Sequence, residues 1–150
     1  MKNLKNCHDI SDLRRAAKNR LPKSIFDFLD GGADDEISMQ MNRSTFGQYD
    51  LVPDALTDVS NVDMSTIIMG QAVSFPLILS PTGMSRIFHH DGERAVALAA
   101  AGAGLIYSLS SNSSVSIEEI GKLTSGPKWF QVYVWKDRSL VKNFISRARD

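Results

Sequence analysis

Residues 75–83 read FPLILSPTG, a short apolar run that a Ser-Pro pair ends. A run of this length between turn residues is typical of a strand that is buried on both faces of a parallel sheet. Two similar runs follow at residues 105–107 and 129–134, so the starts of the three runs lie 30 and 24 residues apart. The sequence therefore predicts three strands at regular spacing.

A helical pattern follows each predicted strand. The first is alanine-rich, runs over residues 91–101 and is closed by glycines. The second begins after Ser116, with Glu119 completing a capping box, and Ser139 caps the third. Strands and helices that alternate at about 30 residues per unit are typical of a (β/α)₈ barrel. We predict an α/β fold in which residues 75–150 form the first three βα units of an incomplete TIM barrel. A complete three-stranded α/β protein is the alternative that this pattern leaves open.

Residues 1–74 form a helical and irregular lead-in segment in this prediction. Ser11 is the expected cap of a first helix. Pro22 can start a second helix, and Gly31-Gly32 is expected to end it in left-handed geometry. Three shorter elements complete the segment, namely a helix over residues 35–43 and strands over residues 66–69 and 72–74.

Composition limits the class of protein. The chain has 150 residues, and its 17 basic side chains balance 17 acidic ones, with no basic patch that would suit nucleic acid. The one cysteine, Cys7, fits a reducing compartment. The longest apolar run, residues 95–107, is shorter than the roughly 20 residues that a membrane span needs. We expect a soluble cytoplasmic protein, and peripheral attachment of a full-length form to the inner membrane stays open.

Polar residues follow each predicted strand, where parallel α/β folds place their sites. They are Ser80 to Met84 after the first strand, Ser108 to Ser114 after the second, and Gln131 with Tyr133 on one face of the third. Amide, hydroxyl and phenol groups suit a polar, planar heterocycle better than a metal ion. Each group taken alone is also explained as an ordinary turn or loop.

Two other polar clusters are expected to be structural. His89 and His90 lie in a loop beside Asp91, but adjacent side chains are expected to point in different directions, and zinc needs further ligands. We therefore expect no metal site. Glu118 and Glu119 open a helix, where the helix dipole explains acidic residues more simply than acid–base catalysis does.

The ordered set of motifs resembles the FMN-dependent 2-hydroxy-acid oxidising family, which includes glycolate oxidase, L-lactate dehydrogenase and mandelate dehydrogenase. The motifs that carry the resemblance are Leu21-Pro22-Lys23, Phe28-Leu29-Asp30-Gly31-Gly32-Ala33, Asn42-Arg43 with Phe46, Phe75-Pro76, Pro81-Thr82-Gly83, Ser108-Leu109-Ser110-Ser111 and Trp129 to Val134. Each motif is weak alone, but their order and spacing match the family over nearly the whole chain. The family fold is an FMN-binding (β/α)₈ barrel that is preceded in the chain by a helical segment.

The resemblance implies a role for each residue of the predicted site. Pro81, Thr82 and Gly83 would line the isoalloxazine of FMN. Ser110 and Gln131 would hydrogen-bond the polar edge of the ring and tune its electronics. Tyr133 corresponds to the catalytic tyrosine that faces the substrate and helps to stabilise the reacting centre.

At two positions the chain differs from many members of the family, and these differences bear on the substrate and on the electron acceptor. Many members of the family have a tyrosine at Phe28 that contacts the substrate carboxylate, so phenylalanine implies a shifted substrate preference. Glycine at position 83 occurs in several dehydrogenases where many oxidases have alanine, which favours a quinone or another acceptor over oxygen. Asn112 is expected to border the substrate side chain.

The resemblance also implies what these residues lack. The family's histidine base, its carboxylate-binding arginines and its phosphate-binding segment come from later barrel strands. We therefore expect an N-terminal portion that is inactive alone, from an enzyme that oxidises a small lactate- or mandelate-like L-2-hydroxy acid as a homo-oligomer, a tetramer. A non-catalytic truncated product or a small α/β binding module is the alternative.

Overall fold

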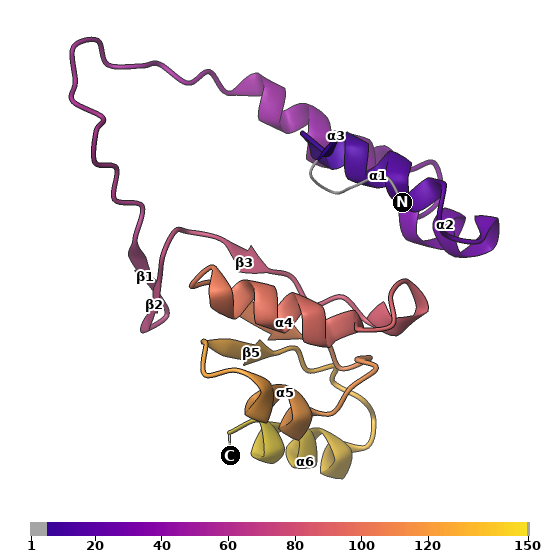
Figure 1. Ribbon diagram of the computed structural model, residues 1–150. Coiled ribbons are helices and arrows are strands. Elements are labelled where there is room, and N and C mark those ends of the chain that lie inside the picture. The colour runs from indigo at the N-terminus through magenta and orange to yellow at the C-terminus, as the bar shows by residue number, and fades with distance from the viewer. Residues whose placement is uncertain (1–5, 150) are drawn as a thin grey trace. The chain divides into compact units, whose positions relative to one another are not determined.

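A computed structural model describes residues 6–149. The chain divides after Ser60 into two compact units, and each is described here by itself (Figure 1). In this division the segment that precedes the first barrel strand groups with the second unit. The functional boundary expected between residues 74 and 75 stays a prediction.

The regular elements within residues 6–60 are helices. They are α1 (Ile10–Lys18), α2 (Lys23–Asp30), α3 (Ile37–Ser44) and the 3₁₀ turn η2 (Thr45–Gln48). The prediction that Ser11 caps the first helix is wrong, because Ser11 lies inside α1. Asp9 caps the helix instead, and its carboxylate accepts the amide N–H of Asp12 at 2.7 Å. A carboxylate suits this position because it also interacts favourably with the helix dipole.

The helix α2 begins after Pro22 and ends at Asp30, as predicted. The residue that follows, Gly31, has φ −83° and ψ 157° and is therefore extended, so the predicted left-handed geometry is wrong. An ion pair joins α2 to α1, with the Arg14 guanidinium donating to both oxygens of the Asp30 carboxylate. This hydrogen bond to Arg14 lowers the pKa of Asp30.

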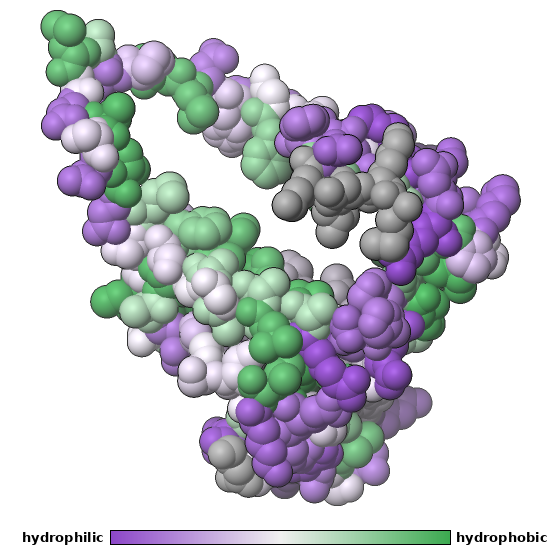
Figure 2. Space-filling model, in the orientation of Figure 1, coloured by the Kyte–Doolittle hydropathy of each residue, from purple (hydrophilic) through white to green (hydrophobic). Residues whose placement is uncertain are grey.

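An extended segment separates the helices from the first strands, and apolar side chains lie along it on the surface (Figure 2). Its exposed members are Leu51, Val52, Leu56, Val59, Val62 and Met64. Exposed apolar side chains gathered in one segment are typical of a surface that packs against another part of a protein or another subunit.

The second unit begins with an antiparallel hairpin of β1 (Thr66–Ile68) and β2 (Gln71–Val73), which confirms the two short strands predicted here. Directly after β2, the amide of Ser74 donates to the carbonyl of Gly104 at 2.9 Å. Gly104 has φ +67°, and a Cβ there would lie 2.2 Å from Ser74 Oγ. Only glycine allows the hairpin to approach this turn so closely.

Three parallel strands follow, β3 (Ile78–Leu79), β4 (Ile106–Leu109) and β5 (Lys128–Phe130), in that spatial order. The helices α4 (Gly92–Gly102), α5 (Ile117–Leu123) and α6 (Arg138–Arg149) come after them in turn, and the 3₁₀ turn η3 (Ser85–Ile87) precedes α4 (Figure 1). The predicted alternation of strand and helix is confirmed. The third strand is shorter than predicted, because pairing with β4 ends at Phe130.

The two faces of this sheet have different surroundings. On one face, Leu79, Tyr107, Leu109 and Phe130 pack in a core with Ala97 and Ala100 of α4 and Ile120 of α5. Because side chains alternate along a strand, Ser108 and its partner Trp129 point to the other face. Ser110 and Gln131 continue that second face, which points inward when such a sheet closes into a barrel.

Two helix caps show how well the sequence predicts local structure. Ser116 caps α5, and its hydroxyl accepts the amide N–H of Glu119 at 3.1 Å. Ser139 does not cap α6, because it lies inside that helix. The Asp137 carboxylate accepts both the amide of Ser139 at 2.9 Å and the amide of Leu140 at 3.3 Å.

Within residues 6–149, every helix falls short of the length and apolar character that crossing a bilayer requires.

Candidate functional site

The loops after the three parallel strands leave the sheet at one edge, because all three strands run in the same direction. These loops carry seven of the residues that the sequence marks for cofactor or substrate, namely Pro81, Thr82, Gly83, Ser110, Asn112, Gln131 and Tyr133. Five of the seven, all except Pro81 and Thr82, are joined by hydrogen bonds or close contacts, which the next paragraphs describe. Their roles in binding stay predictions.

Gly83 lies against the next loop. A Cβ at this position would lie 3.0 Å from Asn112 Cβ, 3.1 Å from the Asn112 carbonyl oxygen and 3.5 Å from Ser110 Oγ. The adjacent amide, Met84 N–H, donates to the same Asn112 carbonyl at 2.9 Å. Gly83 therefore lets the two loops pack closely, and a larger residue would require Asn112 to shift by a few tenths of an ångström.

Hydrogen bonds join the β4 loop to the end of β5. Ser110 Oγ donates to Gln131 Oε1 at 3.1 Å, and the Ser111 amide donates to the same oxygen at 3.4 Å. Ser110 Oγ also accepts the Asn112 amide at 3.1 Å. The Gln131 oxygen is thus engaged within the protein, and the NH₂ group is the part of this amide that can donate to a ligand.

Tyr133 lies two residues beyond Gln131 and is half-exposed. Its amide donates to Ser111 Oγ at 3.0 Å, and its ring packs edge-on against Trp135 with the centroids 5.9 Å apart. The backbone of Tyr133 is therefore fixed to the same network. Pro81 and Thr82 lie in the exposed part of the β3 loop.

Phe28 belongs to the first unit, in α2, and its side chain is 63% exposed. Its predicted place beside the substrate depends on how the first unit meets the loops of the second, and it stays a prediction.

Sequence reasoning missed Glu93, in the first turn of α4. Its side chain is completely buried, and its Oε1 accepts the amides of Ser85 at 3.1 Å and Ser114 at 2.8 Å. Burial raises the pKa of this carboxyl, but backbone hydrogen bonds, with Ser114 first among them, outweigh it and the net shift is downward. An acidic residue in a first helical turn is usually a surface partner of the dipole, so the sequence carries no signal of this burial.

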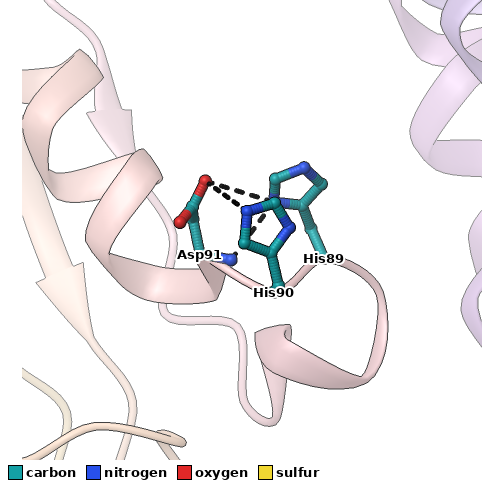
Figure 3. A group of neighbouring side chains, drawn as sticks. All are labelled: His89, His90 and Asp91. Atoms are coloured by element: carbon teal, nitrogen blue, oxygen red, sulfur yellow. Dashed lines mark hydrogen bonds and ion pairs between the residues drawn. The ribbon is translucent and has the colours of Figure 1, made fainter.

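His89, His90 and Asp91 lie together on the exposed loop before α4 (Figure 3). The expectation that the histidines point apart is wrong, because their ring centroids are 4.3 Å apart, and His90 Nε2 lies 3.3 Å from Asp91 Oδ2. Nδ1 of His89 already accepts the Asp91 amide at 3.3 Å. The absence of a bound metal at this loop stays a prediction.

A pocket of about 450 Å³ lies between α5, α6 and β5. Its lining includes Ile117, Lys122, Lys128 and Arg147, but none of the residues predicted for cofactor or substrate. Lys128 Nζ donates to the backbone carbonyls of Thr124 and Gly126. The polar network at the strand ends, rather than this pocket, therefore marks the candidate site.

Comparisons with known proteins agree with this geometry. Residues 17–150 match the model of the FMN-dependent dehydrogenase family. The chain is 41% identical to glycolate oxidase 1 of Zea mays over 140 residues. The matched region is 93% of this chain and 38% of the relative. It is 39% identical over 140 residues to glycolate oxidase of Spinacia oleracea, with the same coverage of 93% and 38%. The chain thus spans about two fifths of the length of these relatives.

Solved structures give the same result. A mandelate oxidase structure superposes with a TM-score of 0.88 at 39% identity, covering 94% of this chain and 42% of that one. A soluble mutant of the membrane-associated (S)-mandelate dehydrogenase from Pseudomonas putida gives 0.91 at 36% identity, covering 96% and 41%. The expected fold class, the opening part of a (β/α)₈ barrel behind a helical segment, is confirmed. The chain belongs to the FMN-dependent dehydrogenase family.

Proposed function

We propose that the protein oxidises a small L-2-hydroxy acid, lactate-like or mandelate-like, to the 2-oxo acid with FMN as its cofactor. The family is FMN-dependent, and its relatives include enzymes named for glycolate and mandelate. The observation that carries the proposal is the joined set of neutral polar groups where the parallel strands end, within a chain that matches this family over residues 17–150.

The residues at this edge fit a flavin ring. Gly83 lets the β3 loop pack directly against Asn112, so that the β3 and β4 loops lie close enough to line one flat ring together. Ser110 and the Gln131 amide are neutral hydrogen-bonding groups, which match the carbonyl and imide groups of an isoalloxazine edge. When it is bound, FMN supplies the acceptor for the hydrogen that leaves the substrate.

Each residue then has a defined task. Backbone from Pro81 to Gly83 lines the ring, and Ser110 with Gln131 orients its polar edge. Tyr133 is the proposed catalytic side chain, which would face the substrate and help to stabilise the reacting centre. Asn112 borders the substrate side chain.

Substrate and acceptor preference follow from two residues. Phe28 cannot donate to a carboxylate as tyrosine would, and a hydrogen bond to a charged group contributes about 1.5–3 kcal/mol. We propose a shifted substrate preference on this ground. Gly83 favours a dehydrogenase that passes electrons to a quinone or similar acceptor rather than to oxygen.

Further proposals concern the whole protein. The residues that supply the base, the carboxylate-binding arginines and the phosphate site in the family have no counterpart in these 150 residues, so the chain alone should not turn over. The whole protein is proposed to be a cytoplasmic homotetramer. The exposed apolar side chains of residues 51–64 support an assembly surface.

Anaerobic flavin reduction tests the proposed activity. The whole protein that contains this chain is mixed with L-lactate, glycolate or (S)-mandelate, and loss of flavin absorbance is followed. We expect reduction by at least one acid, and a reduction rate in Tyr133→Phe lower by roughly 10²-fold or more, the range of a positioned proton-transfer or polarising group. The matched control is Tyr49→Phe, since Tyr49 is exposed in the first unit. A protein that binds no FMN overturns the proposal and favours a non-catalytic α/β module.

A further inference from the structure

Glu93 holds two loops with a single oxygen atom. Its Oε1 accepts the amide of Ser85 at 3.1 Å and the amide of Ser114 at 2.8 Å. Ser85 follows the β3 loop, which contains Gly83, and Ser114 ends the β4 loop, which contains Asn112. Glu93 itself belongs to α4, so one helix side chain connects the two loops that carry the candidate flavin contacts.

Two other hydrogen bonds join the same loops without involving Glu93. The Met84 amide donates to the Asn112 carbonyl at 2.9 Å, and the Arg86 amide approaches Ser114 Oγ at 3.4 Å. Removing Glu93 would take the acceptor from the amides of Ser85 and Ser114, one at the base of each loop. Glu93 therefore contributes to the spacing between Gly83 and Asn112, together with the hydrogen bond from Met84 to Asn112.

The chemistry of the side chain fits a clamp better than simple packing. Glu93 is completely buried, and its Oε2 has no hydrogen-bond partner among residues 6–149. A buried carboxylate with one unpaired oxygen is a costly choice where an apolar side chain could fill the same space. A carboxylate accepts stronger hydrogen bonds than a neutral amide, and at the start of α4 its charge also interacts favourably with the helix dipole.

We propose that Glu93 is a positioning residue that fixes the distance between the two flavin-lining loops. This inference rests on the proposed FMN site. In this proposal Glu93 acts through the backbone of Ser85 and Ser114 and not by contact with flavin or substrate.

Three variants of the whole protein separate the clamp from packing. Glu93→Leu keeps similar volume without an acceptor, Glu93→Asp keeps the charge on a shorter arm, and Glu93→Gln keeps Oε1 without charge. We expect the dissociation constant of FMN to rise by roughly 10-fold or more in Glu93→Leu and Glu93→Asp, and by only a few fold in Glu93→Gln. Partial rescue by glutamine is the signature of an acceptor role.

Glu119→Gln is the matched control, because it breaks the Arg94–Glu119 ion pair between α4 and α5 without touching either loop. FMN affinity in this control should stay within about twofold of the wild type even where stability falls. If Glu93→Leu binds FMN as tightly as the control does, the inference is wrong.

Hydrogen exchange of the FMN-free protein tests the clamp without any flavin. In Glu93→Gln, which should fold even where the leucine variant does not, peptides over residues 80–86 and 110–116 should both exchange faster than in the wild type. The control should leave both peptides unchanged. Faster exchange in one peptide only, or in neither, overturns the clamp. A wild type that binds no FMN but shows the paired effect overturns the proposed function and leaves the clamp intact.

Discussion

The two units of this chain are stabilised in different ways. Among residues 6–60, Phe26 is the only buried side chain, and ion pairs such as Arg14–Asp30 join helices whose apolar residues are largely exposed. The second unit has a core in which Ala97, Leu109 and Ile120 are buried between sheet and helices. Burial of apolar area dominates folding energy, while exposed ion pairs contribute little. The comparison shows that the buried core of the second unit can hold the loops of that unit in place. The first unit buries too little apolar area for its own stability to rest on burial in the same way.

The largest expected effect is a core truncation in the second unit. Ile120→Ala removes a side chain that is 2% exposed within the core cluster, and we expect the free energy of unfolding to fall by about 2–5 kcal/mol. Both tryptophans, Trp129 and Trp135, lie in the second unit, so urea denaturation of the 150-residue chain followed by tryptophan fluorescence measures this unit.

Phe26→Ala sharpens the same comparison. Because Phe26 lies in the other unit, the fluorescence transition should move by less than about 0.5 kcal/mol. Equal shifts in the two variants would mean that the units unfold together and that the comparison fails.

A second, smaller effect is expected at the turn between α4 and β4. Gly104→Ala places a Cβ 2.2 Å from Ser74 Oγ at φ +67°, and we expect a loss of about 1–3 kcal/mol in the same assay. Gly102→Ala is the matched control, since no atom lies within 4 Å of the added Cβ in α4. That variant should gain up to about 1 kcal/mol. If Gly104→Ala unfolded at the same urea concentration as the wild type, the close approach of Ser74 to this turn would not require glycine.

A third prediction concerns pH. Hydrogen bonding to Arg147 of α6 lowers the pKa of Glu118 from 4.5 to about 2. A carboxyl whose folded pKa is depressed stabilises the fold above its ordinary pKa, and this contribution is lost as pH falls from about 4.5 toward 2. Over this pH range the unfolding temperature of the wild type should therefore fall further than that of Glu118→Gln, as thermal unfolding measures. Parallel pH profiles of the two proteins would contradict the pairing.

The smallest effect is expected at the histidine loop. We predict that neither excess Zn²⁺ nor a chelator shifts the unfolding temperature of the chain by more than about 1 °C, since a ligand stabilises only the state that it binds. A zinc-dependent rise that His90→Ala abolishes would instead reveal a metal site at His89, His90 and Asp91.

Much of the fold could be predicted because each βα unit has local signals. Apolar runs at residues 75–79 and 105–107, and the cap at Ser116, specify elements without reference to distant parts of the chain. Competing caps caused the errors at Ser11 and Ser139. In both places an aspartate two residues earlier offers an equivalent acceptor, and only the three-dimensional path of the chain decides between them.

The candidate site could be predicted only in part. Parallel strand ends must meet at one edge, so Gly83, Ser110 and Gln131 could be grouped from the sequence alone. Glu93 could not, because its burial depends on two loops that close over the start of α4. The position of the His89 and His90 rings likewise depends on side-chain rotamers, which residue order does not specify.

The order of the strands has a consequence for how this part of the molecule assembles. Each strand pairs with the next one along the chain, Ile78 with Ile106 and Tyr107 with Lys128, so each pairing closes a loop of fewer than 30 residues. Closing loops of this length costs little more entropy for one pair than for another. The pairing of these strands therefore needs only local loop closure, and within residues 6–149 one side of β5 keeps unpaired backbone groups of the kind with which another strand can pair.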